Sequence, residues 1–279
     1  FIGFFELQLE LLKELKSLEN ISMLENIRFY KGEKQNKDNL SQALAETADV
    51  FVMDAFGTAH RKQASTYGVT KFVKEACVGL LVEEELMALK KIIDSPEKPL
   101  LGIIGGSKIS TKMKILKSLT NHVDKLIIGG ALANTCFKAL GKNIGKSLYE
   151  EAYVDLAKTI IEDKKILLPS YVVVTKGRDS NSQEKHIDEV EDDDIIFDIG
   201  QSAIDDFSQY INSAKTIIWN GPMGYFEEER FAKGTAGIAL KISESSGYSI
   251  IGGGETLASF SNLNTVSYTH LRAHETPRH

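Results

Sequence analysis

The sequence predicts an α/β fold in which helices cover both faces of parallel β-sheets. Short apolar runs alternate with amphipathic helical stretches along most of the chain, and the runs are continuously apolar instead of alternating. This combination is typical of parallel strands that are buried on both faces. Three of the runs lead directly into glycine-bearing turns. In sheets of this kind, ligands bind at the carboxyl ends of the strands, so these turns are the first candidates for a site.

The first third of the chain contains mixed elements and ends at a polar, proline-containing stretch. Helices are predicted at 6–18 and 71–93, and strands at 21–29 and 50–53. Two prolines within the polar stretch 94–99 interrupt the helical pattern, and they predict a domain boundary. The first domain is therefore assigned to residues 1–95.

The second domain, residues 98–265, shows the most regular pattern. Its strands are predicted at 100–104, 125–128, 166–174, 216–219 and 249–251. Its helices are predicted at 111–119, 131–140, 151–161, 203–212 and 256–261. The remaining segment, 266–279, lacks any core periodicity, and we expect a foreign or disordered tail there.

Bulk composition excludes several functional classes. The 279 residues are 42% hydrophobic and 26% charged, which is an ordinary globular balance. With a net charge of −6, neither nucleic acid nor an anionic membrane is expected as a partner. No apolar run approaches the roughly 20 residues of a membrane helix. The two cysteines, Cys77 and Cys136, do not form a disulfide framework, so a cytoplasmic location is expected.

The three glycine-bearing turns predict a nucleoside triphosphate site. They lie at 105–108, 220–224 and 252–256, and glycine lets a backbone approach phosphate closely where a following helix presents free N–H groups. Lys108 and Lys112 are four residues apart, hence on one helix face. An ammonium group about 4 Å from a phosphate oxygen contributes about 4 kcal/mol at an effective dielectric constant near 20. The alternative is that both lysines are solvated on an amphipathic helix.

Carboxylates near two of these turns suggest a divalent ion. Glu227 follows the second turn and Glu255 lies within the third. Proteins usually hold Mg²⁺ through one or two carboxylates together with substrate phosphates. Two other classes stay open on these residues, a nucleotide-binding module without catalysis and an NAD-dependent dehydrogenase. The second lacks its usual G-x-G-x-x-G sequence.

Two arginines in the first domain indicate a second anion site. Arg28 ends one predicted strand, and Arg61 follows another within the segment 54–61. The guanidinium group suits forked contacts with phosphate or carboxylate, so the pair suits a small anionic substrate. The alternative is that each is an ordinary surface or capping arginine.

These segments, taken together, resemble the phosphoglycerate kinase family. The resemblance extends from about Leu7 to about Ser261, and its segments occur in the family order. They are 25–29, 54–61 with 64–66, 105–112, 126–134, 219–227 and 252–256. The resemblance implies two Rossmann-like αβα domains with parallel sheets. It also implies reversible phosphoryl transfer between ATP and 3-phosphoglycerate, giving ADP and 1,3-bisphosphoglycerate, with Mg²⁺ and without a covalent intermediate.

The resemblance also implies roles for individual residues. Arg28 and Arg61 would bind the phosphate of 3-phosphoglycerate. Lys112 would contact the nucleotide phosphates, and Lys108 would neutralise charge on the transferring group. The remaining ATP-binding positions would be Pro222, Glu227, Gly253, Gly254, Glu255 and Thr256. Among these, Pro222 would help to wall the base pocket, Glu227 would bind the ribose, and the last four would hold the phosphates and the metal, with Glu255 as the candidate metal ligand.

The sequence departs from the family pattern in three places. Position 255 is Glu where Asp is usual, and the extra methylene group can shift the metal. The family's opening segment, with a catalytic arginine, and its closing Ser-Thr-Gly-Gly-Gly-Ala turn are absent. We therefore expect a chain truncated at both ends, with an incomplete first domain, weak nucleotide binding and little or no turnover. The full-length protein is expected to be a monomer.

Overall fold

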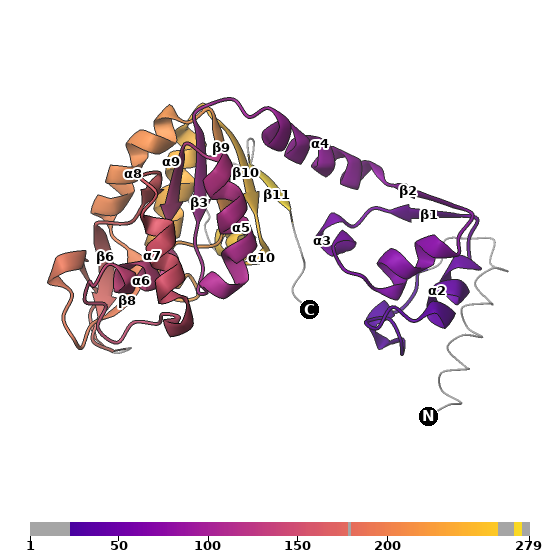
Figure 1. The fold of residues 1–279 in the computed structure, drawn as a ribbon, viewed down its shortest axis with the longest axis horizontal. Coiled ribbons are helices and arrows are strands. Elements are labelled where there is room, and N and C mark those ends of the chain that lie inside the picture. The colour runs from indigo at the N-terminus through magenta and orange to yellow at the C-terminus, as the bar shows by residue number, and fades with distance from the viewer. Residues whose placement is uncertain (1–22, 178–179, 262–270, 275–279) are drawn as a thin grey trace. The chain divides into compact units, whose positions relative to one another are not determined.

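The structure is a computed structural model, and it describes residues 23–177, 180–261 and 271–274. The chain divides into two compact units, residues 1–93 (unit 1) and 94–279 (unit 2) (Figure 1). The division falls at the start of the proline-containing stretch 94–99. None of the described helices combines the length and the apolar character needed to cross a membrane.

Unit 1 has a sheet of two parallel strands, β1 (Val50–Met53) and β2 (Glu75–Val78). Its α-helices are α2 (Asp38–Ala45), α3 (Phe56–Ala59) and α4 (Leu80–Asp94), of which α4 ends at the boundary. Short helical turns lie at η2 (Ile27–Phe29), η3 (Ala64–Gly68) and η4 (Val69–Lys71). Leu40, Ala43 and Ala64 form its small buried cluster, while Val50 and Val52 of β1 remain about half exposed.

Two predictions for unit 1 are wrong. The described part of the predicted strand 21–29 contains the 3₁₀ helix η2, because the Asn26 side chain accepts the Arg28 N–H and stabilises a turn. The predicted helix 71–93 is interrupted by β2, whose four residues are all exposed and give no burial signal in the sequence. The Asp54 carboxylate accepts the Val82 N–H and so starts α4. The predicted helix 6–18 lies outside the described residues.

Unit 2 is built on a six-stranded sheet in which every pairing is parallel, with the order β11-β10-β9-β3-β4-β5. The strands are β3 (Leu100–Ile104), β4 (Lys125–Ile128), β5 (Ile166–Leu167), β9 (Thr216–Asn220), β10 (Tyr248–Gly252) and β11 (Leu271–His274). The helices are α5 (Ile109–His122), α6 (Gly130–Ala139), α7 (Val154–Ile161), α8 (Gln201–Ser213), α9 (Lys233–Glu244) and α10 (Gly254–Ser261). The parallel α/β fold predicted from the sequence is confirmed.

The burial of β3 explains why its sequence is continuously apolar. Leu100 and Ile104 face a core shared with α5, α6 and α7. Leu101 and Ile103 point the other way, into a second core shared with α8 and α9, which lie side by side in Figure 1. Because successive strand residues point to opposite faces, a strand covered on both faces needs apolar residues throughout.

A second sheet of three antiparallel strands was not predicted. Its order is β7 (Gln183–His186), β6 (Tyr171–Thr175) and β8 (Ile195–Ile199). The predicted strand 166–174 is wrong as one element, because β5 and β6 belong to different sheets. Pro169 lies between them, and proline cannot donate a hydrogen bond within a ladder. The short helix η5 (Glu151–Tyr153) precedes α7, and η6 (Ile187–Glu189) and η7 (Glu229–Phe231) lie in loops.

The segment 266–279 contains one short described element. Residues 271–274 form β11, which pairs in parallel with β10 from Ser249 to Gly252. These four residues are therefore ordered, in a strand too short to give a detectable periodicity, and the assignment of the segment as a foreign or disordered tail stays a prediction. The rest of the segment lies outside the described residues.

Candidate functional site

The predicted turns of unit 2 meet at one edge of the six-stranded sheet. The Gly106 N–H, after β3, donates to the Pro222 carbonyl, after β9, over 2.8 Å. The Gly130 N–H, after β4, donates to the Met223 carbonyl over 2.9 Å. Parallel strands end at the same edge, so their loops are neighbours, and here backbone hydrogen bonds join them directly. The turns after β3, β4 and β9 therefore form one continuous surface, which we call the platform.

Gly105 and Gly221 make this close contact possible. A Cβ atom built on Gly105 would lie 2.0 Å from the Pro222 carbonyl oxygen, and one on Gly221 would lie 2.2 Å from the Gly105 oxygen. Gly221 also has a φ of +97°, which side chains other than glycine rarely adopt. From the sequence, such glycines are expected to let the backbone approach phosphate; in the structure, these two let the turns approach each other.

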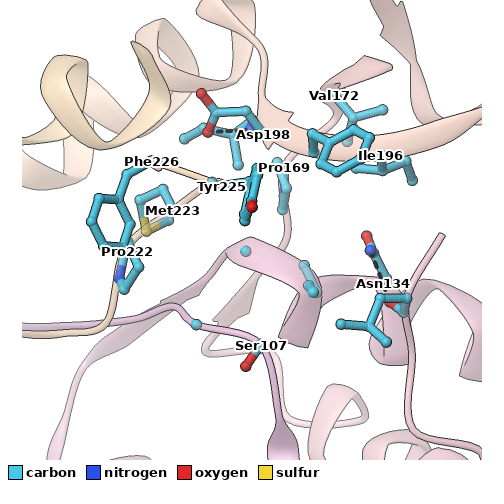
Figure 2. A pocket seen from close by; sticks show the side chains of 18 of the residues that line it. Ser107, Asn134, Pro169, Val172, Ile196, Asp198, Pro222, Met223, Tyr225 and Phe226 are labelled. Atoms are coloured by element: carbon cyan, nitrogen blue, oxygen red, sulfur yellow. Dashed lines mark hydrogen bonds between the residues drawn. The ribbon is translucent and has the colours of Figure 1, made fainter. Parts of the chain in front are cut away.

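A pocket of about 400 Å³ opens beside the platform. In Figure 2, Pro222 and Phe226 lie on one side of it and Asn134 and Ile196 on the other. The predicted residues Pro222, Glu227 and Glu255 all line it, Pro222 buried and both carboxylates exposed. Other lining residues include Gly106, Ser107, Phe137, Leu148, Pro169, Val172, Asp198 and Tyr225. The wall is mostly apolar, with polar groups at few positions, as is typical of a small-molecule site.

The two predicted lysines have different surroundings. Lys108 is exposed and stands immediately before α5, at its N-cap position. Lys112 is partly buried, and its Nζ donates to the Asn220 side-chain oxygen. Burial lowers the pKa of Lys112, while the Glu255 carboxylate acts in the opposite direction. Lys112 is thus directed toward the platform and lies close enough to Glu255 to interact with it electrostatically.

Asn220 is a site residue that the sequence analysis did not single out. Its side-chain oxygen accepts from Lys112, and its Nδ2 donates to the Gly252 carbonyl over 3.0 Å. It therefore joins α5 to the turn after β10. The available signal was a polar side chain that ends an apolar run just before a glycine.

The turn after β10 leads into α10. Gly253 has a φ of +99°, and α10 starts at Gly254 with Glu255 in its first turn. The Thr256 hydroxyl is hydrogen-bonded within the protein, since it accepts the Gly221 N–H over 2.7 Å and donates to the Gly252 carbonyl over 3.0 Å. The first N–H groups of a helix have no partner within the helix, so the backbone here can bind an anion.

Asp198 was also missed, although it lines the pocket. It is buried at the end of β8, and its carboxylate accepts the Gly234 N–H over 2.7 Å and the Ile199 N–H over 2.9 Å. Burial raises its pKa to about 8, against the opposite effect of these two donors. Gly234 lies in the first turn of α9, so Asp198 fixes the end of the loop that contains Glu227.

Glu150 fixes the start of the helix that contains Lys112. Its carboxylate accepts the Ser110 N–H over 2.9 Å and the Ser110 hydroxyl over 2.6 Å. These hydrogen bonds lower the pKa of Glu150 in spite of the opposing effect of burial. Helix α5 is therefore capped by Glu150, which lies in a loop 40 residues away in the sequence, and no local sequence pattern predicts this contact.

The acidic turn between β7 and β8 is the other place where carboxylates gather among the described residues. Oxygens of Glu191, Asp193 and Asp194 lie within 4.8 Å of one another. Lys185 contacts Asp194 at 2.7 Å, and Lys176 contacts Glu191 at 2.8 Å. Each of the three carboxylates is paired with Lys176 or Lys185, so the cluster is a structural ion-pair network, and Glu255 stays the metal-ligand candidate.

The predicted arginines belong to unit 1. Arg28 lies in η2 and Arg61 follows α3, and both side chains are partly buried. Three hydrogen bonds with neighbouring residues hold the Arg61 backbone: its N–H donates to the Thr58 carbonyl, and its carbonyl accepts the Gln63 N–H and the Thr66 hydroxyl. Their role in binding a phosphorylated substrate stays a prediction.

Comparison with known proteins gives consistent results. The family model described as "PGK: Phosphoglycerate kinase" matches residues 6–273. A curated phosphoglycerate kinase from Vibrio campbellii is 47% identical over 251 residues, which cover 88% of this chain and 65% of that protein. The solved structure of phosphoglycerate kinase from Coxiella burnetii is 44% identical with a TM-score of 0.79, covering 86% of this chain and 64% of that one. The enzyme from Pyrococcus horikoshii OT3 is 27% identical with a TM-score of 0.81, covering 93% and 69%.

The family match extends further along the chain than the resemblance seen in the sequence. It ends at residue 273, beyond residue 261, where the sequence analysis ended the resemblance. The chain spans about two thirds of the length of the relatives from Vibrio campbellii and Coxiella burnetii. A dehydrogenase finds no support among these matches. The extent of the family match and the identity to the curated relative show that this chain belongs to the phosphoglycerate kinase family.

Proposed function

We propose that this chain binds a magnesium-complexed adenine nucleotide in the pocket of unit 2. We further propose that it serves the reversible transfer of a phosphoryl group between ATP and 3-phosphoglycerate. The main support is the meeting of Lys112, Asn220 and the start of α10 at the edge where the strands end. Family membership supplies the reaction, and this geometry supplies a place for the nucleotide phosphates.

Different residues at this edge bind the phosphates, the group in transfer and the metal ion. The N–H groups at the start of α10 and the Lys112 ammonium group bind the nucleotide phosphates, and Lys108 neutralises charge on the group in transfer. Glu255 fits a magnesium ligand, because it is an exposed carboxylate on the pocket wall and Mg²⁺ is usually held by one or two carboxylates plus phosphates. When bound, the ion neutralises charge on the phosphates.

The other residues orient the reactants. Pro222 walls the base, Glu227 binds the ribose, and Arg28 and Arg61 bind the phosphate of 3-phosphoglycerate. Phosphoryl transfer depends on in-line positioning and charge stabilisation, so these residues need no nucleophilic side chain among them. A cytoplasmic location and a monomeric full-length protein accompany this proposal.

Titration calorimetry with MgADP tests the nucleotide part. We expect saturable binding to this chain, since the platform, Lys112 and α10 all lie within unit 2. Absence of binding at millimolar MgADP would contradict the proposal. A chain with Glu255→Gln serves as a comparison, because it should retain ADP binding while its dependence on magnesium weakens.

The alternative function, a nucleotide-binding module without catalysis, differs in its second ligand. Such a module should not bind 3-phosphoglycerate, whereas a kinase should bind this ligand through Arg28 and Arg61. A coupled assay with MgATP and 3-phosphoglycerate measures turnover directly. We expect little or no turnover from this chain, and near-normal turnover would overturn that expectation.

A further inference from the structure

Asn134 is a buried polar side chain on the wall of the pocket. It lies on α6, one turn after Gly130, and its side chain is 1% exposed. Both residues line the pocket, so this face of α6 forms part of the wall. Figure 2 shows Asn134 below Ile196 and Val172, across from Pro222.

The amide nitrogen of Asn134 has a hydrogen-bond partner in the described part of the chain, and the amide oxygen has none. Its Nδ2 donates to the Leu148 carbonyl over 3.1 Å. Its Oδ1 is buried and accepts no hydrogen bond from any residue in the described part of the chain. Exchanging the two amide atoms would set an oxygen against the Leu148 carbonyl, so this contact fixes Oδ1 as the atom left over. A buried acceptor without a donor is unfavourable, and a ligand donor would relieve it.

The surroundings of Asn134 suit a flat aromatic ring. Phe137, Val172 and Ile196 line the same part of the pocket, and all three are buried apolar side chains. Asp198, the other buried carboxylate or amide on the wall, already accepts two backbone N–H groups. Asn134 Oδ1 differs in that it is buried on this wall and accepts no hydrogen bond from the described part of the chain.

We propose that Asn134 Oδ1 accepts a hydrogen bond from the exocyclic amine of the nucleotide base and thereby favours adenine over purines that lack this amine. The inference rests on the proposed nucleotide binding and extends it to base selection. Oδ1 is itself covered by its neighbours, so the amine reaches it only after a side-chain movement. Leu148, whose carbonyl accepts from Asn134 Nδ2, lines the pocket and is 59% exposed, so its side chain is one that can shift when a base binds.

The test compares two nucleotides on two proteins by titration calorimetry. ADP is compared with purine riboside 5′-diphosphate, which keeps the ring and phosphates but has no amine. The original chain should bind ADP about 3- to 10-fold more tightly, the range of one neutral hydrogen bond. In Asn134→Leu, which keeps the side-chain size without the amide, ADP should lose this advantage and the two affinities should agree within about twofold.

The outcomes distinguish failure of the Asn134 inference from failure of the proposed nucleotide binding. Binding of both nucleotides with an unchanged ratio in Asn134→Leu would overturn the role of Asn134 and leave nucleotide binding intact. Failure of the original chain to bind either nucleotide would overturn both. Purine riboside 5′-diphosphate also reports whether the variant keeps a folded site. If Asn134→Leu does not fold, equal affinity of the original chain for the two nucleotides would still overturn the inference.

Discussion

Gly105→Ala is expected to lower the free energy of unfolding of unit 2 by about 3 kcal/mol or more, the upper part of the range for overpacking. The new methyl group would lie 2.0 Å from the Pro222 carbonyl oxygen and 2.7 Å from its carbonyl carbon. Backbone atoms cannot rotate aside as a flexible side chain can. The turns after β3 and β9 must therefore separate, and the Gly106 to Pro222 hydrogen bond is lost with them.

Trp219 makes this measurement selective for unit 2. It is the single tryptophan of the chain, it is fully buried in β9, and it directly precedes the affected turn 220–224. Urea unfolding followed by its fluorescence should show the loss in Gly105→Ala. Gly177→Ala is the control, because a methyl group there would meet its first neighbour at 3.8 Å. A change below about 1 kcal/mol in Gly105→Ala would contradict the packing of the turns.

Replacing Asp198 by alanine is expected to lower the free energy of unfolding of unit 2 by about 2–6 kcal/mol, because two buried N–H groups would lose their acceptor and each such loss costs about 1–3 kcal/mol. The affected groups belong to Ile199 and to Gly234 at the start of α9. The loop that contains Glu227 ends at this helix. Weaker nucleotide binding should therefore accompany the lower stability.

Asp198 also predicts a dependence of stability on pH. Its pKa is about 8 in the folded chain and about 3.9 when unfolded, so the folded state retains a proton between these values. The stabilisation from this proton is complete below about pH 4 and is lost as the pH rises through 8. Asp198→Asn stays neutral throughout, so its stability relative to the original chain should rise between pH 5.5 and 8.5. A constant difference over this range would refute the raised pKa, and exposed Asp205→Asn is the control.

The sequence predicted those parts of the fold whose burial is uniform. The strands β3, β4, β9 and β10 each contain a run of buried apolar residues because helices cover both faces, and this pattern is visible without a structure. In contrast, β2 has four exposed residues, and half of β7 is exposed. Their place depends on backbone pairing with a distant strand, which leaves no periodic signal in so few residues.

The site was predicted only in part, because residues that act through distant partners give no local signal. The glycine turns and Lys112 are recognisable because residue type and position after a strand already indicate phosphate chemistry. Asn220, Asp198 and Glu150 act through partners 32 to 108 residues away in the chain. A single polar residue gives no sign of such partners until the fold brings them together.

Calorimetric titration of Lys112→Ala with MgADP and with adenosine tests most directly whether this edge of the sheet binds nucleotide phosphates. We predict that MgADP affinity falls about 10- to 150-fold, which corresponds to about 1.5–3 kcal/mol for hydrogen bonds to charged groups. Adenosine has no phosphates, so its affinity should not change, and Lys117→Ala, at an exposed position of the same helix, should bind both ligands normally. Unchanged MgADP affinity in Lys112→Ala, or an equal loss for adenosine, would contradict the assignment.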